Sequence, residues 1–429
     1  MTLWRGAKPP DSSSQPAAGL ARRLGTGDAV VIGLGAMIGA GVFAVFAPAA
    51  AAAGAGLLAG LAVAAVVAYC NATSSARLAA RHPASGGTYV YGRERLGDLW
   101  GYLAGWAFLV GKAASCAAMA LTLGAYVWPG HEHLVAVAAV AVLTAVNYAG
   151  VHKAAWLTRV IVVVVLAVLA VAVVVCLVGG PAEFARLRPS SWPAPGAVLQ
   201  AAGLLFFAFA GYARIATLGE EVRDPAKTIP KAIPIALGLV LVIYAAVAVA
   251  VLAVLGPERL ARSTAPVVDA VRAAGAAPAV ASLVTVGAAT AALGSLLALI
   301  LGVSRTVLAM ARDGHLPRVL DAVHLRFQVP HRAELAVGAV VAVAAATTDL
   351  RGAIGFSSFG VLVYYAIANA CALTLSEEEG RPVRALPVVG LLGCLLLAFS
   401  LPLSAVLTGA AVLAAGLLLR ALRRSPRPG

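Results

Sequence analysis

The first long apolar run of the chain, Asp28–Ala50, contains the motif Gly33-Leu-Gly-Ala-Met-Ile-Gly-Ala-Gly-Val-Phe43. Each of its four glycines costs a helix about 1 kcal/mol relative to alanine. One explanation is close helix packing, since Gly35 and Gly39 form a GxxxG face. The other is a break in the helix at Gly39–Gly41, which leaves backbone amides free to bind a ligand.

Composition places this run in a membrane protein. The 429 residues are 61% hydrophobic and 12% charged, with a mean hydropathy of +0.93. A soluble domain is about 45–50% apolar and about 25% charged, and disordered chains are poor in apolar residues. Both classes are therefore excluded. The five cysteines lie in apolar runs without CxxC spacing, so we expect no disulfide framework, no metal site and no cofactor.

The apolar runs predict twelve transmembrane helices, because a hydrocarbon core needs about 20 apolar residues per helix. The runs are Asp28–Ala50, Gly54–Arg77, Leu99–Val127, Leu134–Gly150, Ala154–Val178, Gly196–Gly219, Ile233–Leu255, Pro278–Ser304, Ala333–Thr347, Ala353–Leu375, Leu386–Phe399 and Leu401–Leu419. They divide the chain into a tail at 1–27, helical groups at 28–178 and 196–376, a final helix pair at 385–420 and a second tail at 421–429.

Basic residues predict the orientation of these helices. Of the 32 Lys and Arg residues, 24 fall in the tails and loops on one side and 6 on the other. Cytoplasmic loops collect Lys and Arg, so we expect a multi-pass protein of the cell (inner) membrane with both termini cytoplasmic. The net charge of +14 has the same origin, and we expect the lipid bilayer as a partner and no nucleic acid.

The remaining two basic residues, Lys112 and Arg214, lie inside apolar segments. A charge at the bilayer centre costs about 2.5–3.5 kcal/mol, so such residues usually face a cavity. We interpret both as coupling or gating candidates. The alternative for Lys112 is a structural cation bound to backbone carbonyls. For Arg214 the two interpretations are a role with the substrate and an ion pair with the gate candidates Glu220 or Glu221.

A second candidate break lies five helices after the first. The chain there reads Phe206-Phe-Ala-Phe-Ala-Gly-Tyr212, which places Gly211 where an inverted repeat would match Gly41. Pairs of discontinuous helices in corresponding positions of two repeats line substrate sites in secondary transporters. The pattern therefore favours a transporter.

Five motifs in order resemble the amino acid–polyamine–organocation (APC) superfamily of permeases. They are Gly35–Phe43, Pro83-Ala-Ser-Gly-Gly-Thr-Tyr-Val-Tyr91, Asn147-Tyr-Ala-Gly-Val151, Phe206–Gly211 with Gly219-Glu-Glu-Val-Arg-Asp-Pro225, and Met310-Ala-Arg-Asp-Gly-His-Leu-Pro317. The resemblance implies an all-α polytopic fold of twelve transmembrane helices. Ten of them form a five-plus-five inverted repeat with broken helices 1 and 6, and two are peripheral.

The resemblance also implies a function and a site. In such permeases amino acids move by alternating access, with the substrate carboxylate on helix-one amides and its amino group on carbonyls of helices one and six. The matching positions here are Ile38, Gly39, Ala40 and Gly41 in helix one, and Phe207, Phe209, Ala210 and Gly211 in helix six.

Two positions depart from the family pattern. Val165 stands where many proton-coupled relatives carry a lysine, and Ala213 stands where relatives often carry Asp or Glu. We therefore expect neutral amino acids as substrates and no dependence on sodium, with protons as a candidate coupling ion through Lys112. An exporter or exchanger, and a transporter-like amino acid sensor, remain as alternatives. An enzyme is not expected, because the acidic residues map to loops or helix ends and no HExxH motif is present.

Overall fold

The computed structural model describes residues 24–82, 86–150, 155–180, 182–188, 193–216, 222–324 and 326–424. Within these ranges the chain is helical, and the only strand-like pairing is an isolated bridge between Leu24 and Val222. This agrees with a bilayer as solvent, because a helix satisfies its backbone hydrogen bonds within one segment.

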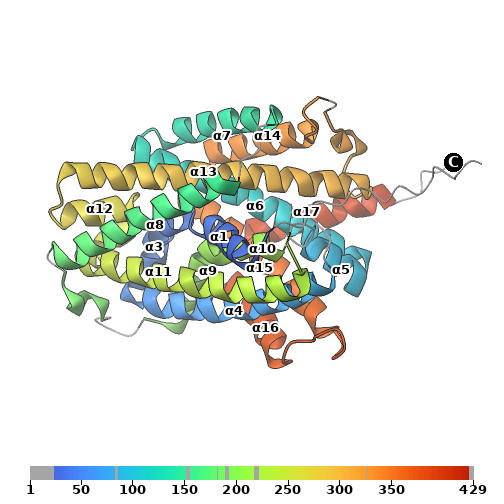
Figure 1. Ribbon diagram of the computed structural model, residues 1–429, viewed down its shortest axis with the longest axis horizontal. Coiled ribbons are helices and arrows are strands. Elements are labelled where there is room, and N and C mark those ends of the chain that lie inside the picture. The colour runs from blue at the N-terminus through green and yellow to red at the C-terminus, as the bar shows by residue number, and fades with distance from the viewer. Residues whose placement is uncertain are drawn as a thin grey trace, which may run out of the picture.

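The apolar runs of the sequence form the long helices (Figure 1). In chain order the α-helices are α1 (Thr26–Met37), α2 (Gly41–Ala44), α3 (Phe46–Ala53), α4 (Leu57–Arg81), α5 (Thr88–Leu96), α6 (Asp98–Val127), α7 (Glu132–Tyr148), α8 (Ala155–Val178), α9 (Pro195–Phe209), α10 (Ala213–Ala216), α11 (Pro225–Arg262), α12 (Pro266–Ala273), α13 (Pro278–Arg312), α14 (His331–Thr347), α15 (Leu350–Leu373), α16 (Ala385–Ser400) and α17 (Leu403–Arg424). The 3₁₀ turns are η1 (Gly54–Gly56), η2 (Phe184–Leu187), η3 (Ala210–Tyr212) and η4 (Arg318–Asp321).

Each of the twelve predicted spans overlaps one of these helices. In the described ranges, nine helical stretches are long and apolar enough to cross a membrane, and α7 and α16 are shorter apolar helices. Large apolar side chains are exposed on the outer helices, for example Val163 and Val174 of α8 at 65% and 58%. The chain is therefore a multi-pass membrane protein with lipid-facing apolar surface.

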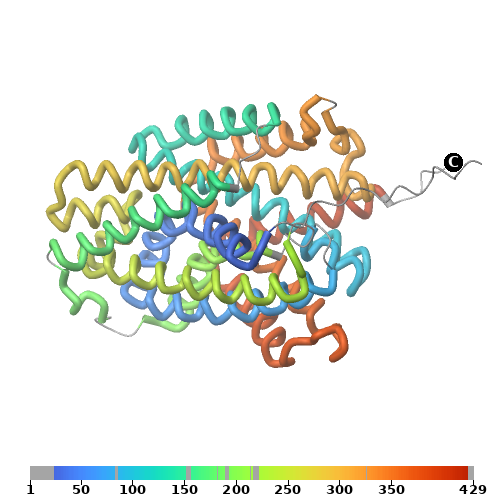
Figure 2. The backbone as a smooth tube through the Cα atoms, in the orientation of Figure 1, coloured from blue at the N-terminus to red at the C-terminus, as the bar shows by residue number. Residues whose placement is uncertain are grey.

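The broken helices lie inside the bundle. Figures 1 and 2 show α7 and α14 side by side at one edge, α16 at the opposite edge, and α1 between them. Around the core, α6 packs against α13 and α15, and α4 packs against α9, α11 and α16. Buried amides also join helices, because the Asn369 side chain donates to Asn71 Oδ1 at 2.6 Å and accepts from Ser74 Oγ at 2.7 Å. Such polar contacts hold helices together where lipid supplies no hydrophobic drive.

Candidate functional site

The first helix break is one residue earlier than the sequence predicted. Helix α1 ends at Met37, and Ile38 leaves the helical region with ψ of 60° while its amide still donates to Leu34 O at 2.7 Å. Helix α2 begins at Gly41, so the break comprises Ile38–Ala40 and not Gly39–Gly41. Among the described residues, the backbone amides of Gly39 and Ala40 have no backbone acceptor. These amides are the free donors that a carboxylate requires.

The second break lies where it was predicted. Helix α9 ends at Phe209, the 3₁₀ turn η3 covers Ala210–Tyr212, and α10 resumes at Ala213. Phe207, Phe209 and Ala210 are buried, with 7%, 0% and 3% of their surface exposed. The change from α to 3₁₀ hydrogen bonding at this turn marks a local departure from regular helix.

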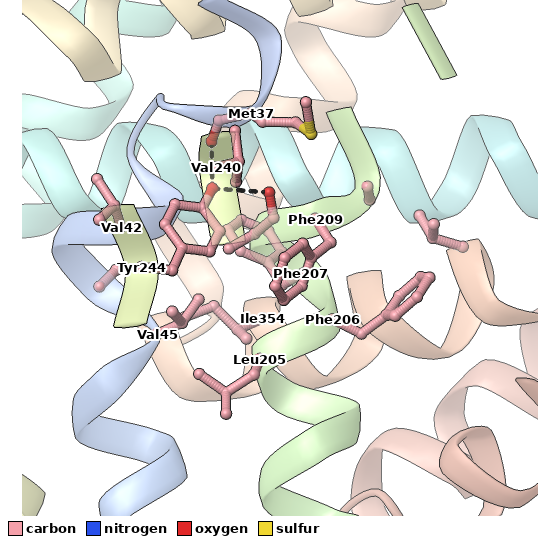
Figure 3. Packing of buried hydrophobic residues seen from close by; sticks show 14 of the residues in the cluster. Met37, Val42, Val45, Leu205, Phe206, Phe207, Phe209, Val240, Tyr244 and Ile354 are labelled. Atoms are coloured by element: carbon pink, nitrogen blue, oxygen red, sulfur yellow. Dashed lines mark hydrogen bonds between the residues drawn. The ribbon is translucent and has the colours of Figure 1, made fainter. Parts of the chain in front are cut away.

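The two breaks are in contact. A Cβ on Gly211 would lie 2.3 Å from Ala36 O and 2.7 Å from Met37 N, and a Cβ on Gly41 would lie 3.0 Å from Ala208 Cα. Glycine is therefore required for the close approach of the backbones. Tyr244 of α11 lies at the junction, and its hydroxyl oxygen is 2.6 Å from Met37 O and 3.0 Å from Ala208 O, so these two carbonyls share its single proton (Figure 3).

Lys112 lies beside the second break. It is 8% exposed and its ammonium donates to Ala210 O at 3.2 Å, the same carbonyl that accepts from the Tyr365 hydroxyl at 3.2 Å. The ring of Tyr365 stacks on Tyr212, with centroids 4.9 Å apart. The carbonyl contact agrees with the structural alternative for Lys112, and its position at the break agrees with the functional one.

The other predicted residues divide into those near the breaks and those away from them. Ala40 and Ile38 are buried at the helix-one break, and Val165 of α8 is fully buried. Arg214 lies on α10 and its side chain is exposed, so it does not share the buried position of Lys112. The gate candidates Glu220 and Glu221 lie outside the described residues.

The sequence matches a known protein family. Residues 24–416 match the family described as amino acid permease. The chain belongs to this family. At 71% identity over 94% of this permease and 92% of the relative, it is similar to a Mycobacterium tuberculosis protein named an uncharacterized transporter. Two proteins of Bacillus subtilis are similar at lower identity. One is the branched-chain amino acid permease BcaP (26% identical, 89% of this permease, 88% of the relative), and the other is a methylthioribose transporter (28%, 91% and 91%).

Sequence reasoning missed the two tyrosines that position the breaks of the permease. Tyr244 and Tyr365 are each about 1% exposed, and each hydroxyl donates to a carbonyl at or beside a break. A signal existed, because a tyrosine in an apolar helix needs a partner for its hydroxyl when it is buried.

Glu334 lies at a helix end, as the sequence predicted, but nothing in the sequence indicated that it is buried. It lies in the first turn of α14, yet it is 0% exposed. In the described part of the permease neither carboxylate oxygen has a hydrogen-bond partner, and the Thr144 hydroxyl is likewise unpaired. Helix α14 packs against α7 and α13, and these tertiary contacts are not evident from the position of Glu334 in the sequence.

Polar contacts join several elements on the side predicted to be cytoplasmic. Before α1, Leu24 O accepts from Arg223 N at 2.8 Å, and Asp28 of α1 forms an ion pair with Arg159 of α8. On the same predicted side, His315 Nε2 lies 3.0 Å from Asp98 Oδ1 and its Nδ1 lies 2.9 Å from the Tyr89 hydroxyl. Burial lowers the pKa of His315 below its ordinary value of 6.5.

Proposed function

We propose that this permease moves neutral amino acids across the inner membrane by alternating access, without sodium. One observation carries the proposal: the two helix breaks meet, with Gly211 against Ala36 and with free amides at Gly39 and Ala40. Broken helices that meet at the midplane form substrate sites in secondary transporters, and free amides at a helix end attract a carboxylate.

The proposed topology has twelve membrane crossings, with both termini cytoplasmic. The overlap of each predicted span with a helix and the excess of basic residues on one side support it. Ten crossings form two inverted five-helix repeats, at 28–178 and 196–376, and α16 and α17 are peripheral. The two helix breaks, one in the first helix of each repeat, support this assignment.

Neutral substrates follow from the charges at the breaks. The site contains the Lys112 ammonium, and Ala213 supplies no carboxylate to balance a second positive charge. Two like charges about 4 Å apart repel by about 4 kcal/mol at an effective dielectric of about 20. The branched-chain amino acid permease among the relatives agrees with a neutral side chain.

Uptake into liposomes tests the proposal. The purified full chain is reconstituted and screened against labelled amino acids, with sodium or potassium outside and with or without a pH gradient. We expect uptake of a neutral amino acid such as leucine, unchanged by sodium, and weak competition by arginine and lysine.

Other results of the same assay identify the alternatives. Uptake that requires amino acid inside the liposomes identifies an exchanger. Efflux of amino acid without uptake identifies an exporter. Binding without flux identifies a sensor and overturns transport. Tight binding and transport of arginine overturn the assignment to neutral substrates.

A further inference from the structure

One hydrogen-bond acceptor at the second break is already filled by the protein itself. Ala210 O accepts from both Lys112 and Tyr365, while Met37 O and Ala208 O share the single proton of the Tyr244 hydroxyl. A carbonyl oxygen has two lone pairs, so two side-chain donors fill the acceptor capacity of Ala210. A substrate ammonium therefore finds this helix-six carbonyl occupied.

Donors at the breaks remain available. A lysine ammonium has three N–H donors, and Lys112 uses one of them on Ala210 O. In the described ranges the amides of Gly39 and Ala40 also have no backbone acceptor. Gly211, the residue after Ala210, abuts Ala36 and Met37, which directly precede the helix-one break.

The charge of Lys112 has no counterion among the residues that the structure describes. The titratable groups around it are the Cys116 thiol one turn further along α6 and the phenols of Tyr365 from α15 and Tyr212 from η3. No described carboxylate forms an ion pair with Lys112. An unpaired ion is destabilised in the low dielectric of a protein interior, and an anionic ligand removes that destabilisation.

From the filled acceptor Ala210 O, the free donors and the missing counterion we infer that Lys112 is the counterion of the substrate carboxylate and that the α-amino group is dispensable for binding. The permease therefore also takes carboxylates without an α-ammonium, such as 2-hydroxy acids with neutral side chains. This inference rests on the proposed function, because it places the transported molecule at the same two breaks.

Binding by three analogues tests the inference. The full chain in detergent is titrated with leucine, its 2-hydroxy analogue and leucinamide, and the thermal shift gives each dissociation constant. We expect the hydroxy acid to bind within about threefold of leucine, and leucinamide to bind at least tenfold more weakly. The amide keeps the ammonium and loses the carboxylate, so the reverse order overturns the inference. If the uptake screen selects another amino acid, its own three analogues are used.

Two variants identify the residue responsible. Lys112→Met keeps the length of the side chain and removes its charge, so we expect it to lose the preference for the hydroxy acid over the amide. Lys112→Arg keeps the charge and is expected to retain the preference. If Lys112→Met does not fold, the affinities of wild type and Lys112→Arg for the hydroxy acid and the amide still test the inference. An unchanged preference in folded Lys112→Met overturns the role of Lys112.

The inference and the proposed function fail in different ways. A wild-type protein that binds leucinamide as well as leucine, and the hydroxy acid not at all, leaves amino acid transport in place and refutes carboxylate-led recognition. A protein that binds hydroxy acids while no amino acid is transported refutes the proposed function and retains the inference.

Discussion

Gly211→Ala tests whether the contact between the two breaks is needed for transport. The added Cβ would lie 2.3 Å from Ala36 O and 2.5 Å from Ala36 C, against 3.4 Å for an ordinary contact. These neighbours are backbone atoms, so helices one and six must separate by about 1 Å, because a close-packed interior has no free volume to absorb the group. Overpacking of this kind costs about 1–3 kcal/mol.

This overpacking destabilises the conformation in which the two breaks meet. If substrate binds only to that conformation, its population and the apparent affinity decrease together. A cost of about 1–3 kcal/mol corresponds to roughly 5–150-fold weaker binding, which uptake at graded substrate concentrations measures as a raised half-saturation. Thermal unfolding in detergent checks that the variant is folded.

A matched control separates this effect from the general response of a helix to alanine. Gly238 of α11 is exposed, and a Cβ there would meet no atom within 4 Å. We expect Gly238→Ala to retain wild-type uptake. Wild-type affinity in Gly211→Ala, or an equal loss in both variants, would refute the assignment of the site to the junction of the breaks.

Three further predictions concern charged groups. If Lys112 gains and loses a proton during transport, uptake depends on pH in the wild type and Lys112→Met removes that dependence; coincident pH profiles in liposomes would exclude it as the coupling residue. Because burial lowers the pKa of His315 below 6.5, the fold favours neutral imidazole, so stability is full above pH 6.5 and decreases as the pH falls below it. We expect the unfolding temperature of His315→Gln to decrease less than that of the wild type between pH 6.5 and 5. An equal decrease in both proteins would show that other titratable groups cause it. Asp28→Asn breaks a half-exposed ion pair with Arg159 worth up to about 1 kcal/mol, so a reporter cysteine at Ala29, which is 0% exposed, should label up to about fivefold faster. The five native cysteines are buried and give a low background, and equal labelling rates would show that the pair does not hold α1.

Much of the fold follows from local properties of the sequence. Apolar runs predicted the helices because burial in lipid depends on composition over about 20 residues. Gly211 predicted the second break because a backbone that approaches another within contact distance requires glycine. The first break was displaced by one residue, to Ile38–Ala40. Its start coincides with the bond from Tyr244 to Met37 O, a contact between residues 207 positions apart that no local pattern contains.

The partner of Lys112 could not be predicted either, because it depends on which carbonyl the packing of α6 brings near. The sequence left two interpretations, a structural cation on carbonyls and a functional charge. The hydrogen bond to Ala210 O agrees with a structural cation. A cation with a purely structural role is expected to direct its remaining N–H groups to further acceptors. Among the described residues, the hydrogen bond of Lys112 is to Ala210 O. Since that carbonyl also accepts from Tyr365, the same contact that anchors the ammonium removes an acceptor from the substrate's amino group. The two interpretations are then compatible, and the comparison of hydroxy acid with amide measures whether the anchored charge also selects the substrate.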